Sequence, residues 1–318
     1  MDFVIRKTTE LTEEEIFSFC QLFEEVFVGH VKSVEYFKRE FLNTSLGYSY
    51  HALMFDGNKM VGANSLIPCD YVYKGEHVLM AFSVDTMIKK GYRDFFNLKD
   101  LIDLIEDEAR KTGIFFVFGF PNDNAYPILK KGIKYKDIGK MYTYVLPYRI
   151  GGIKPCFFFL NPLSKLFCKC LIKWSLFVAN HKSHFAMIDR ERETFNTYRY
   201  KWFEQDYCKV NLDNFSFIYR IKKHEGVRTA FLLDINCISA RNIAMAVDYI
   251  CENDGALFDL LMYVGVLPCS NFPFVRIPRK YEPKNFNFVG KFLDKKMMNK
   301  DFFDILNWNV NLSCYDLV

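Results

Sequence analysis

The stretch from Phe82 to Gly132 constrains the fold of this chain most, because strand and helix patterns alternate in it without a long interruption. Residues 84–88 have the β-branched and apolar content of a strand. Apolar side chains then recur at helical spacing, at Leu98, Leu101, Ile102, Ile105 and Ala109, before the stop signal Thr112-Gly113. The run Ile114–Phe120 is almost continuously apolar, which is typical of a strand covered on both faces. The pattern predicts a strand, a tight loop, a long helix, a buried strand and a short helix.

The loop between the first of these strands and the long helix is the first candidate for chemistry. The start of a helix leaves backbone N–H groups unpaired and carries the positive end of the helix dipole, so it suits a phosphate. After the buried strand, Asn122, Asp123 and Asn124 provide capping residues for the short helix that ends near Gly132. The search for a site therefore starts at this loop.

The residues before Phe82 predict further strands and helices. A strand over residues 3–7 precedes a capping box of Thr12 and Glu15, which opens a helix with one apolar face. Ser33 caps a second helix, and two hairpins turn at residues 56–58 and at Lys74-Gly75. Residues 138–147 are expected to close the sheet. This order predicts an α+β fold with a mixed, twisted sheet flanked by helices.

The length of 318 residues is comfortable for two domains. Gly151-Gly152 and Pro155 mark a boundary, so we expect an N-terminal domain over residues 1–150, an amphipathic segment over 151–185 and a C-terminal domain over 186–318. The 34 Phe residues predict a large aromatic core. The net charge of +4 is small for this length, so it gives no reason to expect a nucleic acid as the main partner.

The ten cysteines show no zinc-site spacing and no compact disulfide framework. His181 and His184 are three positions apart but have no further ligand nearby, so no metal site is expected. The first residues carry charges where a signal peptide needs an apolar run. We therefore expect a cytoplasmic protein with buried thiols.

Three motifs of the central stretch resemble a known family. Tyr92-Arg93 opens the long helix, Gly-Phe-Pro-Asn-Asp-Asn follows the buried strand at 119–124, and Lys-Lys-Gly-Ile-Lys-Tyr at 130–135 precedes the next strand. The combination is similar to the acyl-CoA-binding core of the GNAT N-acetyltransferases. It is also similar to a bacterial GNAT subgroup in which Gly-Phe-Pro-Asn and Tyr-Pro occur together. The resemblance covers residues 3–147 well and the C-terminal half faintly.

The resemblance implies acetyl-CoA or another acyl-CoA as cosubstrate, with no metal. In the family, a splayed strand pairs with pantetheine, which here implies Met87 and Ile88, with Asn124 orienting pantetheine or capping the helix. The following loop cradles the diphosphate, which implies Arg93, Asp94, Phe95, Phe96, Asn97 and Leu98. The family loop runs Arg/Gln-x-x-Gly-x-Gly/Ala, whereas this chain has no glycine at 93–98, and the family's tyrosine position falls on Ile128.

Acyl transfer to an amine needs a base for the ammonium proton and an acid for the leaving thiolate. Asp85 lies in the strand beside the expected thioester position and is the candidate base; its alternative is a carboxylate hydrogen-bonded within the sheet. Tyr126 is the candidate acid, with aromatic packing as its alternative. Arg93 could meet the CoA phosphates or stay solvated, and Asp94 could cap the long helix.

Residues 156–180 predict an amphipathic, basic helix that starts at Asn161-Pro162. Apolar residues hold helical spacing, and Lys165, Lys169 and Lys173 line another face. One interpretation is attachment to an anionic membrane surface, and the other is a helix packed between two domains with its lysines in water. We favour the packed helix over membrane contact. No unbroken apolar run here is long enough to span a bilayer, so no transmembrane segment is expected.

The C-terminal half predicts strands at 215–223 and 227–235, a helix capped by Ser239, a buried strand at 258–264 and terminal strands at 274–277 and 286–292. This β-β-α-β order resembles a degenerate GNAT half. Its loop at 236–239 has no glycine, so we expect this half to bind no CoA. It is expected to form a wall of the acceptor site or to support the first domain.

Two functions remain open. The first is an acyl-CoA-dependent N-acetyltransferase that moves the acyl group directly to an amine of a small molecule, a sugar or a peptide. The second is a non-catalytic GNAT-fold binding or regulatory protein whose CoA loop has decayed. The oligomeric state has no signal in the sequence.

Overall fold

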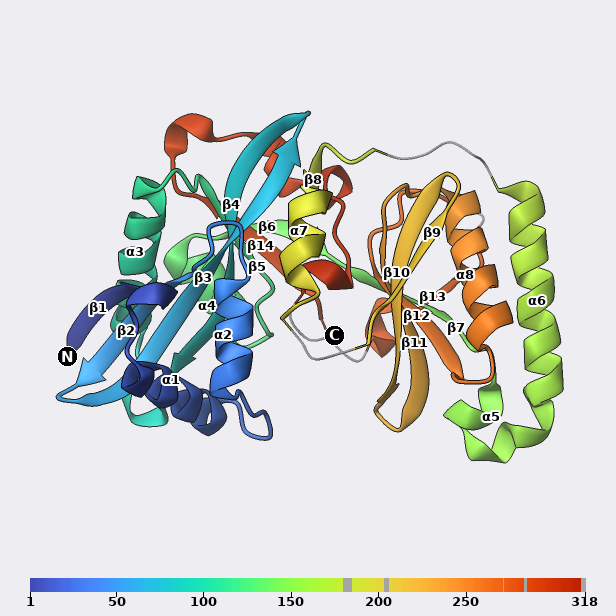
Figure 1. Cartoon of the computed structure of the whole chain (residues 1–318), viewed down its shortest axis with the longest axis horizontal. Helices are drawn as coiled ribbons and strands as arrows, with labels where there is room; N and C mark the ends of the chain where they lie inside the picture. The colour runs from blue at the N-terminus through green and yellow to red at the C-terminus, as the bar shows by residue number, and fades with distance from the viewer. Residues whose placement is uncertain (180–184, 203–205, 271, 283–284, 316–318) are drawn as a thin grey trace. The chain divides into compact units, whose positions relative to one another are not determined.

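Figure 1 shows the computed structural model of the chain, which describes residues 1–179, 185–202, 206–270, 272–282 and 285–315. The chain forms two compact units, each built on its own mixed sheet flanked by helices. Unit 1 comprises Met1–Gly139, Met187–Glu204 and Phe286–Trp308. Unit 2 comprises Lys140–Ala186, Gln205–Asn285 and Asn309–Val318. The predicted α+β class is confirmed.

Unit 1 has one large sheet and five helices among its described residues. Its strands are β1 (Asp2–Lys7), β2 (Tyr50–Asp56), β3 (Lys59–Tyr73), β4 (Glu76–Ile88), β5 (Phe116–Gly119), β6 (Lys136–Lys140), β8 (Ile188–Arg190) and β14 (Asn287–Phe292). Its helices are α1 (Glu13–Val26), α2 (Val34–Leu42), α3 (Phe95–Lys111), α4 (Ala125–Ile128) and α7 (Arg192–Arg199). The strand order is β1-β2-β3-β4-β5-β14-β6, with β8 paired to β3. β4 and β5 run parallel, and α3 connects them.

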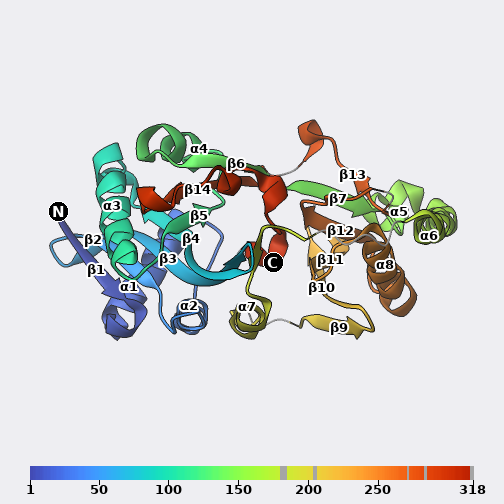
Figure 2. The ribbon, with the colours of Figure 1, turned by 90° about the horizontal axis from the view of Figure 1, so that it is seen from above.

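The side chains of β2 decide which helices cover which face, because successive side chains of a strand point to opposite sides. His51 meets the rings of Phe19 in α1 and Phe37 in α2 at centroid distances of 5.8 and 5.4 Å. The next residue, Ala52, belongs instead to a core cluster with Leu101 of α3. Thus α1 and α2 cover one face of the sheet and α3 covers the other, as Figure 2 shows.

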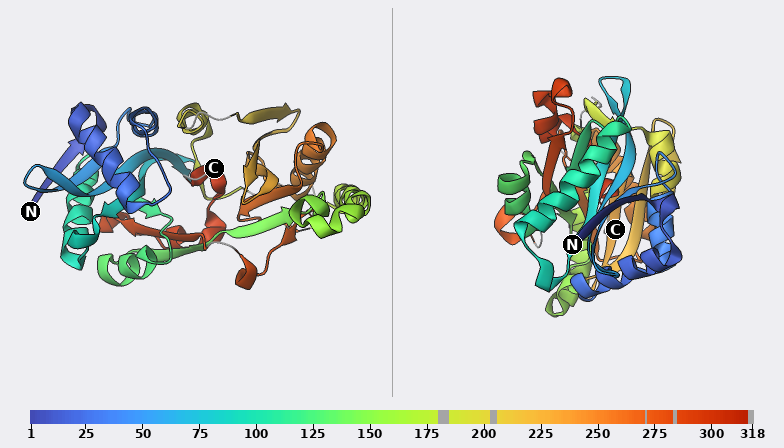
Figure 3. Two further views of the ribbon diagram at one scale, coloured as in Figure 1. Left: turned by 90° about the horizontal axis from the view of Figure 1, so that it is seen from below. Right: turned by 90° about the vertical axis from the view of Figure 1, so that its left-hand side faces the viewer.

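Helix starts in unit 1 follow the capping residues of the sequence. The Thr12 hydroxyl accepts from the backbone N–H of Glu15 at 3.1 Å, and the Glu15 carboxylate accepts from the N–H of Thr12 at 2.9 Å. Ser33 caps α2 through the N–H of Tyr36. From its start, α3 runs across the strands of the first sheet (Figure 3, right). The predicted capping box is confirmed.

Unit 2 repeats part of this order on a second sheet. Its strands are β7 (Tyr142–Leu146), β9 (Cys208–Leu212), β10 (Phe215–His224), β11 (Val227–Ile235), β12 (Leu260–Gly265) and β13 (Val275–Arg276). Its helices are α5 (Ile150–Ile153), α6 (Asn161–Val178) and α8 (Ala240–Asp254). The strand order is β13-β7-β12-β11-β10-β9. The series β10, β11, α8, β12 has the same antiparallel-then-parallel pairing as β3, β4, α3, β5, which confirms the predicted β-β-α-β order.

The two units exchange segments along the chain, which differs from the expected division into 1–150, 151–185 and 186–318: unit 2 takes β7, and unit 1 takes β8, α7 and β14. β7 was expected to close the first sheet, but it pairs antiparallel with β12 in unit 2. β14 comes from the C-terminal region and pairs antiparallel with β5 in unit 1. Both β7 and β14 can form backbone hydrogen bonds with the open edge of a parallel strand. Which of them pairs with which sheet depends on contacts between residues far apart in the chain, and local sequence patterns do not encode these contacts.

The position of α6 also corrects an expectation. Only one side of it is buried, through Cys168, Ile172 and Ser175, while the opposite side is exposed. The expectation was a helix packed between two domains; in the structure α6 packs with one side on α8 of its own unit, and its opposite apolar side is exposed. By length and composition alone, Pro155–Val178 is apolar enough to cross a membrane, and 11% of its most apolar part is buried. This segment joins a 3-10 turn over Pro155–Leu160 to α6, and it reaches its length without an unbroken apolar run.

Candidate functional site

The open edge of β4 is the main feature of the predicted site. β4 pairs with β5 over Met80–Ser83, opposite Phe116–Gly119, where β5 ends. β4 continues for five more residues to Ile88. Among the described residues, no strand pairs with this edge of β4 beyond Ser83. Backbone N–H and C=O groups on this edge have no partner strand there, which leaves room for an extended ligand to pair with them.

A β-bulge lies within this open segment. Val84 pairs with Ser65 and Met87 with Ala63, so Asp85 and Thr86 together oppose the single residue Asn64 of β3. Asp85 has a positive φ of 49°, which is uncommon for a residue with a side chain. The Thr86 hydroxyl donates to the Asn64 carboxamide oxygen at 2.8 Å and fastens the bulge to β3. The expected base therefore lies at a strained backbone position.

The carboxylate of Asp85 is held by a buried ammonium. Lys32, from the segment before α2, donates to Asp85 and to Glu40 of α2, the latter at 2.5 Å. Burial alone would lower the pKa of Lys32, but the two carboxylates outweigh it and raise the pKa above its ordinary value. The Lys32 ammonium also lies over the rings of Phe23 and Phe41 at 4.7 and 4.9 Å. Lys32 and Glu40 carried no motif, so sequence reasoning missed them.

A second buried polar group, His51, lies near this cluster. Its ring nitrogens are 2.9 Å from the hydroxyl of Thr8 and 2.9 Å from that of Ser65. Burial, together with the charge of Lys32, lowers the pKa of His51 to about 3. The imidazole is therefore neutral at pH 7. His51 carries no motif of its own in the sequence, so sequence reasoning missed it.

The corner between β4 and α3 is closed by its own side chains. Asp94 is the N-cap of α3, and its carboxylate accepts from the backbone N–H of Asn97 at 2.8 Å. The Asn97 carboxamide donates to the carbonyl of Tyr92 at 2.9 Å, and Arg93 Nε donates to the carbonyl of Ile88 at 2.7 Å. The negative charge of Asp94 is thus placed where the helix dipole attracts an anion.

Two phenylalanines follow this cap. Both are exposed, Phe96 more than Phe95, and the ring of Phe95 packs over Gly132 after α4. A Cβ at Gly132 would lie 2.3 Å from the Phe95 ring, so a larger residue there would require the ring to move. Leu98, the last residue of the predicted loop, packs instead against the α3 core. Met87 and Ile88 are buried and can offer only their backbone to a ligand.

Tyr126 lies in α4, after the end of β5. Its hydroxyl donates to Asp137 of β6 at 2.5 Å, and Lys130 bonds the same carboxylate. The hydrogen bond to Asp137, with a smaller contribution from burial, raises the pKa of Tyr126. Asn122, rather than Asn124, caps α4 through the N–H groups of residues 124 and 125. The exposed Asn124 side chain makes no cap hydrogen bond.

The structure therefore brings the predicted residues together in three local groups. Asp85 joins Lys32, the residues from Arg93 to Asn97 form the corner, and Tyr126 joins Asp137. A surface hollow of about 570 Å³ lies elsewhere, between β1 and the second half of α3. Among the described residues, no three His, Cys, Asp or Glu side chains lie close enough to hold a metal ion. His181 and His184 lie outside the described residues.

Unit 2 has a related corner at the start of α8. Ser239 caps the helix through the N–H of Asn242 at 3.0 Å. The Asn242 carboxamide donates to the carbonyl of Cys237 at 2.8 Å, as Asn97 does to Tyr92 in unit 1. Like β4, β11 pairs with the next parallel strand only in part, from Thr229 to Phe231, and has a register shift beyond it, opposite Ile218 and Tyr219. It differs from β4 in that it carries no positive φ.

Comparison with solved structures shows what this fold is similar to. A GCN5-related N-acetyltransferase from Anabaena variabilis superposes with a TM-score of 0.59 at 13% identity, covering 92% of this chain and 73% of that one. A GCN5-related N-acetyltransferase from Kribbella flavida gives 0.56 at 10% identity, with coverages of 92% and 72%. A probable N-acyltransferase from Enterococcus faecalis gives 0.56 at 12% identity, with coverages of 92% and 73%. No protein-family model and no curated protein sequence matches the chain. These superpositions show a GNAT-like fold over 92% of the chain, and at identities of 10–13% they show the fold alone.

Proposed function

We propose that this protein is an acyl-CoA-dependent N-acyltransferase that moves an acyl group directly from the CoA thioester to an amine acceptor. The open edge of β4 from Val84 to Ile88, which leads into the N-terminus of α3, carries this proposal. The backbone of Met87 and Ile88 would pair with the pantetheine amides. The first N–H groups of α3, at Phe95 and Phe96, have no partner within the helix and would receive phosphate oxygens.

In the proposed reaction, the acceptor nitrogen attacks the thioester carbonyl carbon, the C–S bond breaks, and CoA leaves as a thiolate that takes up a proton. Asp85 is the proposed base and receives the ammonium proton through water. Two carboxylates and one ammonium give the Asp85, Glu40 and Lys32 cluster a net charge of −1, which favours a cationic acceptor. Tyr126 is the proposed acid, and its proton is held by Asp137 until the thiolate forms.

The remaining predicted residues have supporting roles in this proposal. Arg93 and the segment from Asp94 to Leu98 form the phosphate corner, and the exposed Asn124 carboxamide would bind pantetheine. The acceptor is an amine of a small molecule, a sugar or a peptide, and the reaction takes place in the cytoplasm. Unit 2, whose loop at 236–239 has no glycine and whose β11 has no positive φ like that of Asp85, would bind no CoA.

A non-catalytic GNAT-fold module is the second candidate function. The position of Asp94 favours it, because the carboxylate already occupies the N–H of Asn97 and would repel a diphosphate. The Phe95 ring, packed on Gly132, adds bulk where the family loop has small residues. In this case the protein would bind neither acetyl-CoA nor a longer acyl-CoA.

Calorimetric titration with acetyl-CoA and with palmitoyl-CoA decides between the two. The variant Asp94→Ser keeps an oxygen cap on α3 but removes the negative charge, so we expect its Kd for acyl-CoA to fall by about fivefold. Asp100→Ser removes an exposed acid from the same helix, away from the corner, and should leave Kd within about twofold. If neither acyl-CoA gives a heat of binding at millimolar concentration, with the wild-type protein or with Asp94→Ser, the non-catalytic module is established.

A further inference from the structure

The outer side of α6 and the helical turn before it carry large exposed apolar side chains, which together we call the α6 apolar face. It consists of Phe158, Phe159, Leu163, Phe167, Trp174 and Phe177, and their exposed fractions run from 50% at Trp174 to 90% at Phe177. Within α6 these residues recur three, four or seven positions apart and so share one side of the helix. Contiguous exposed apolar surface of this kind marks an interaction site.

The opposite side of α6 is fastened to unit 2. Cys168 and Ile172 join the core cluster that contains Val247 and Cys251 of α8. Lys169 pairs with Glu252 of α8 at 2.9 Å. Figures 1 and 2 show α6 and α8 side by side. The apolar face is therefore presented by a helix whose other side is already used in packing.

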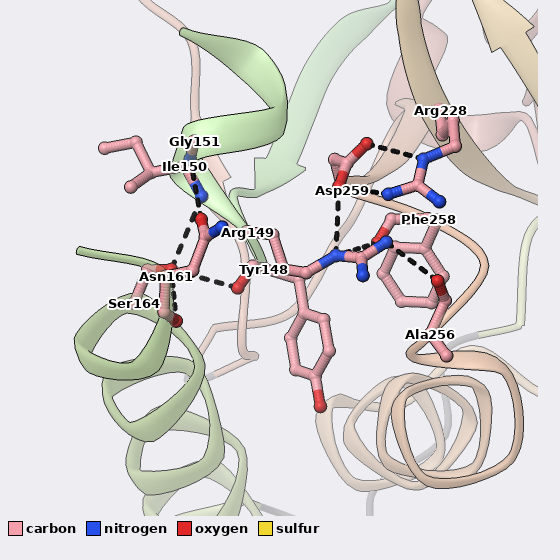
Figure 4. Close-up of polar contacts among 10 residues, drawn as sticks. All are labelled: Tyr148, Arg149, Ile150, Gly151, Asn161, Ser164, Arg228, Ala256, Phe258 and Asp259. Carbon is pink, nitrogen blue, oxygen red and sulfur yellow. Dashed lines mark hydrogen bonds and ion pairs between the residues drawn. The ribbon is translucent and has the colours of Figure 1, made fainter. Parts of the chain in front are cut away.

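The start of α6 is held by a hydrogen-bonded seat, drawn in Figure 4. The Asn161 side-chain oxygen accepts from the N–H of Gly151 at 2.7 Å, and the Ser164 hydroxyl donates to the carbonyl of Tyr148 at 3.1 Å. The neighbouring Arg149 pairs with buried Asp259 at 2.9 Å and donates to the carbonyl of Phe258 at 3.0 Å. These hydrogen bonds hold the beginning of α6 against the residues that follow β7, and Arg149 joins the same residues to those that precede β12.

Charge around the apolar face is one-sided. The sequence has no Asp or Glu between Asp137 and Asp189, although the chain has 38 of them. Lys154, Lys165, Lys169 and Lys173 are the cations of this segment from the turn before α6 to its end, and Lys173 borders the apolar face. The acids that face α6 come from α8, where Asp248 and Glu252 lie near Lys169 and Lys173. A surplus of positive charge remains beside the exposed aromatic rings.

We infer that the α6 apolar face docks unit 2 onto the surface of a bilayer that contains anionic lipid, with α6 lying in the plane of the membrane. Aromatic and leucine side chains would enter the headgroup–acyl boundary, and the lysines would contact anionic headgroups. A helix that spans the bilayer would have to give up its packing on α8 and its polar seat. A second copy of the chain fits less well, because a two-fold contact through this face would bring identical lysines together. This inference is independent of the acyl-transfer proposal.

Vesicle flotation of the full chain tests the inference. We expect it to float with vesicles in which about a third of the lipid is phosphatidylglycerol, and less with pure phosphatidylcholine or at high salt. Phe158→Ser with Phe177→Ser should weaken binding by about tenfold or more, because both rings leave the interface. Lys154→Gln with Lys173→Gln should weaken binding to the anionic vesicles alone, by about fivefold per lysine.

Controls separate docking from misfolding. Phe17→Ser removes a phenylalanine of unit 1 with 55% exposure and should leave flotation unchanged. Thermal unfolding should be the same for all variants, since the altered side chains are exposed. Trp174 adds a second readout, because the other two tryptophans, at 202 and 308, are buried. Its fluorescence should shift to the blue with anionic vesicles, and Trp174→Phe should abolish the shift.

Three outcomes overturn the inference. They are no flotation with either vesicle, flotation that ignores lipid charge, or flotation that the phenylalanine pair does not change. If the full chain instead dimerises in sedimentation velocity, without binding vesicles, and Phe158→Ser with Phe177→Ser restores the monomer, the face is a protein interface and not a membrane-docking surface.

Discussion

Lys32 and Asp85 form a buried ion pair across 53 positions of the chain, with only 2% and 7% of their side chains exposed. The pair joins the segment before α2 to the bulge of β4, and Glu40 completes it from α2. Lys32 and Glu40 therefore hold Asp85 at the point where β4 departs from regular pairing with β3. The candidate base is therefore paired with a residue that has no motif of its own.

Replacing Lys32 by Met should destabilise the protein by about 3–5 kcal/mol, because Asp85 and Glu40 would remain buried without their cation. Chemical denaturation measures the change. Lys38→Met, which breaks the exposed pair with Glu13, should cost at most about 1 kcal/mol. Equal effects of the two substitutions would contradict the burial of the Lys32 cluster.

The stability of the protein should fall on acidification because of His51. Its folded-state pKa of about 3 lies below the ordinary value of 6.5, so between these limits the unfolded chain binds a proton that the folded chain does not. The free energy of unfolding should therefore decrease by about 1.4 kcal/mol per pH unit as pH falls through this window. Urea titrations from pH 7 to pH 4 should show a flatter dependence for His51→Gln. The exposed His77→Gln should keep the wild-type slope.

Replacing Tyr126 by Phe removes the hydroxyl that donates to Asp137, together with the proposed acid. If the proposed reaction is correct, kcat should fall by at least about tenfold while KM for acyl-CoA stays the same. Steady-state kinetics with an amine acceptor panel provides the measurement. Tyr281→Phe, an exposed tyrosine of unit 2, serves as the control. An unchanged kcat would assign the acid to another group.

The pairing of β14 with β5 can be tested through Gly290. A Cβ at this position would lie 2.2 Å from the buried ring of Phe116, so Gly290→Ala should destabilise the protein by about 1–3 kcal/mol. A Cβ at Gly91 meets nothing within 4 Å, so Gly91→Ala should be close to neutral in the same thermal unfolding assay. Similar midpoints for both variants would argue against β14 next to β5.

A fragment of residues 1–150 should not fold into a stable domain, since it lacks β14 and leaves the apolar edge of β5 unpaired. Circular dichroism and size-exclusion chromatography would show loss of cooperative unfolding and aggregation. Adding a synthetic peptide of residues 286–308 should restore part of the structure. A monomeric fragment that unfolds cooperatively by itself would contradict the exchange of strands between the units.

Local patterns in the sequence determined most individual elements. The capping box of Thr12, the cap of Asp94 and the β-β-α-β order of both halves follow from near-neighbour spacing, and each is present in the structure. Asp94 as a helix cap was one of two stated alternatives. The placement of Asp85 and Tyr126 in the region of the β4 and β5 ends also follows from strand order.

The tertiary structure alone decided which sheet receives β7 and β14, which cation holds Asp85, and which side of α6 is exposed. These are contacts between residues far apart in the sequence. The sequence does not specify them, because an apolar strand or a buried carboxylate can be matched by many different partners. Periodicity specifies the face that a helix or strand can bury, but the element that covers this face is chosen by the packing of the whole chain.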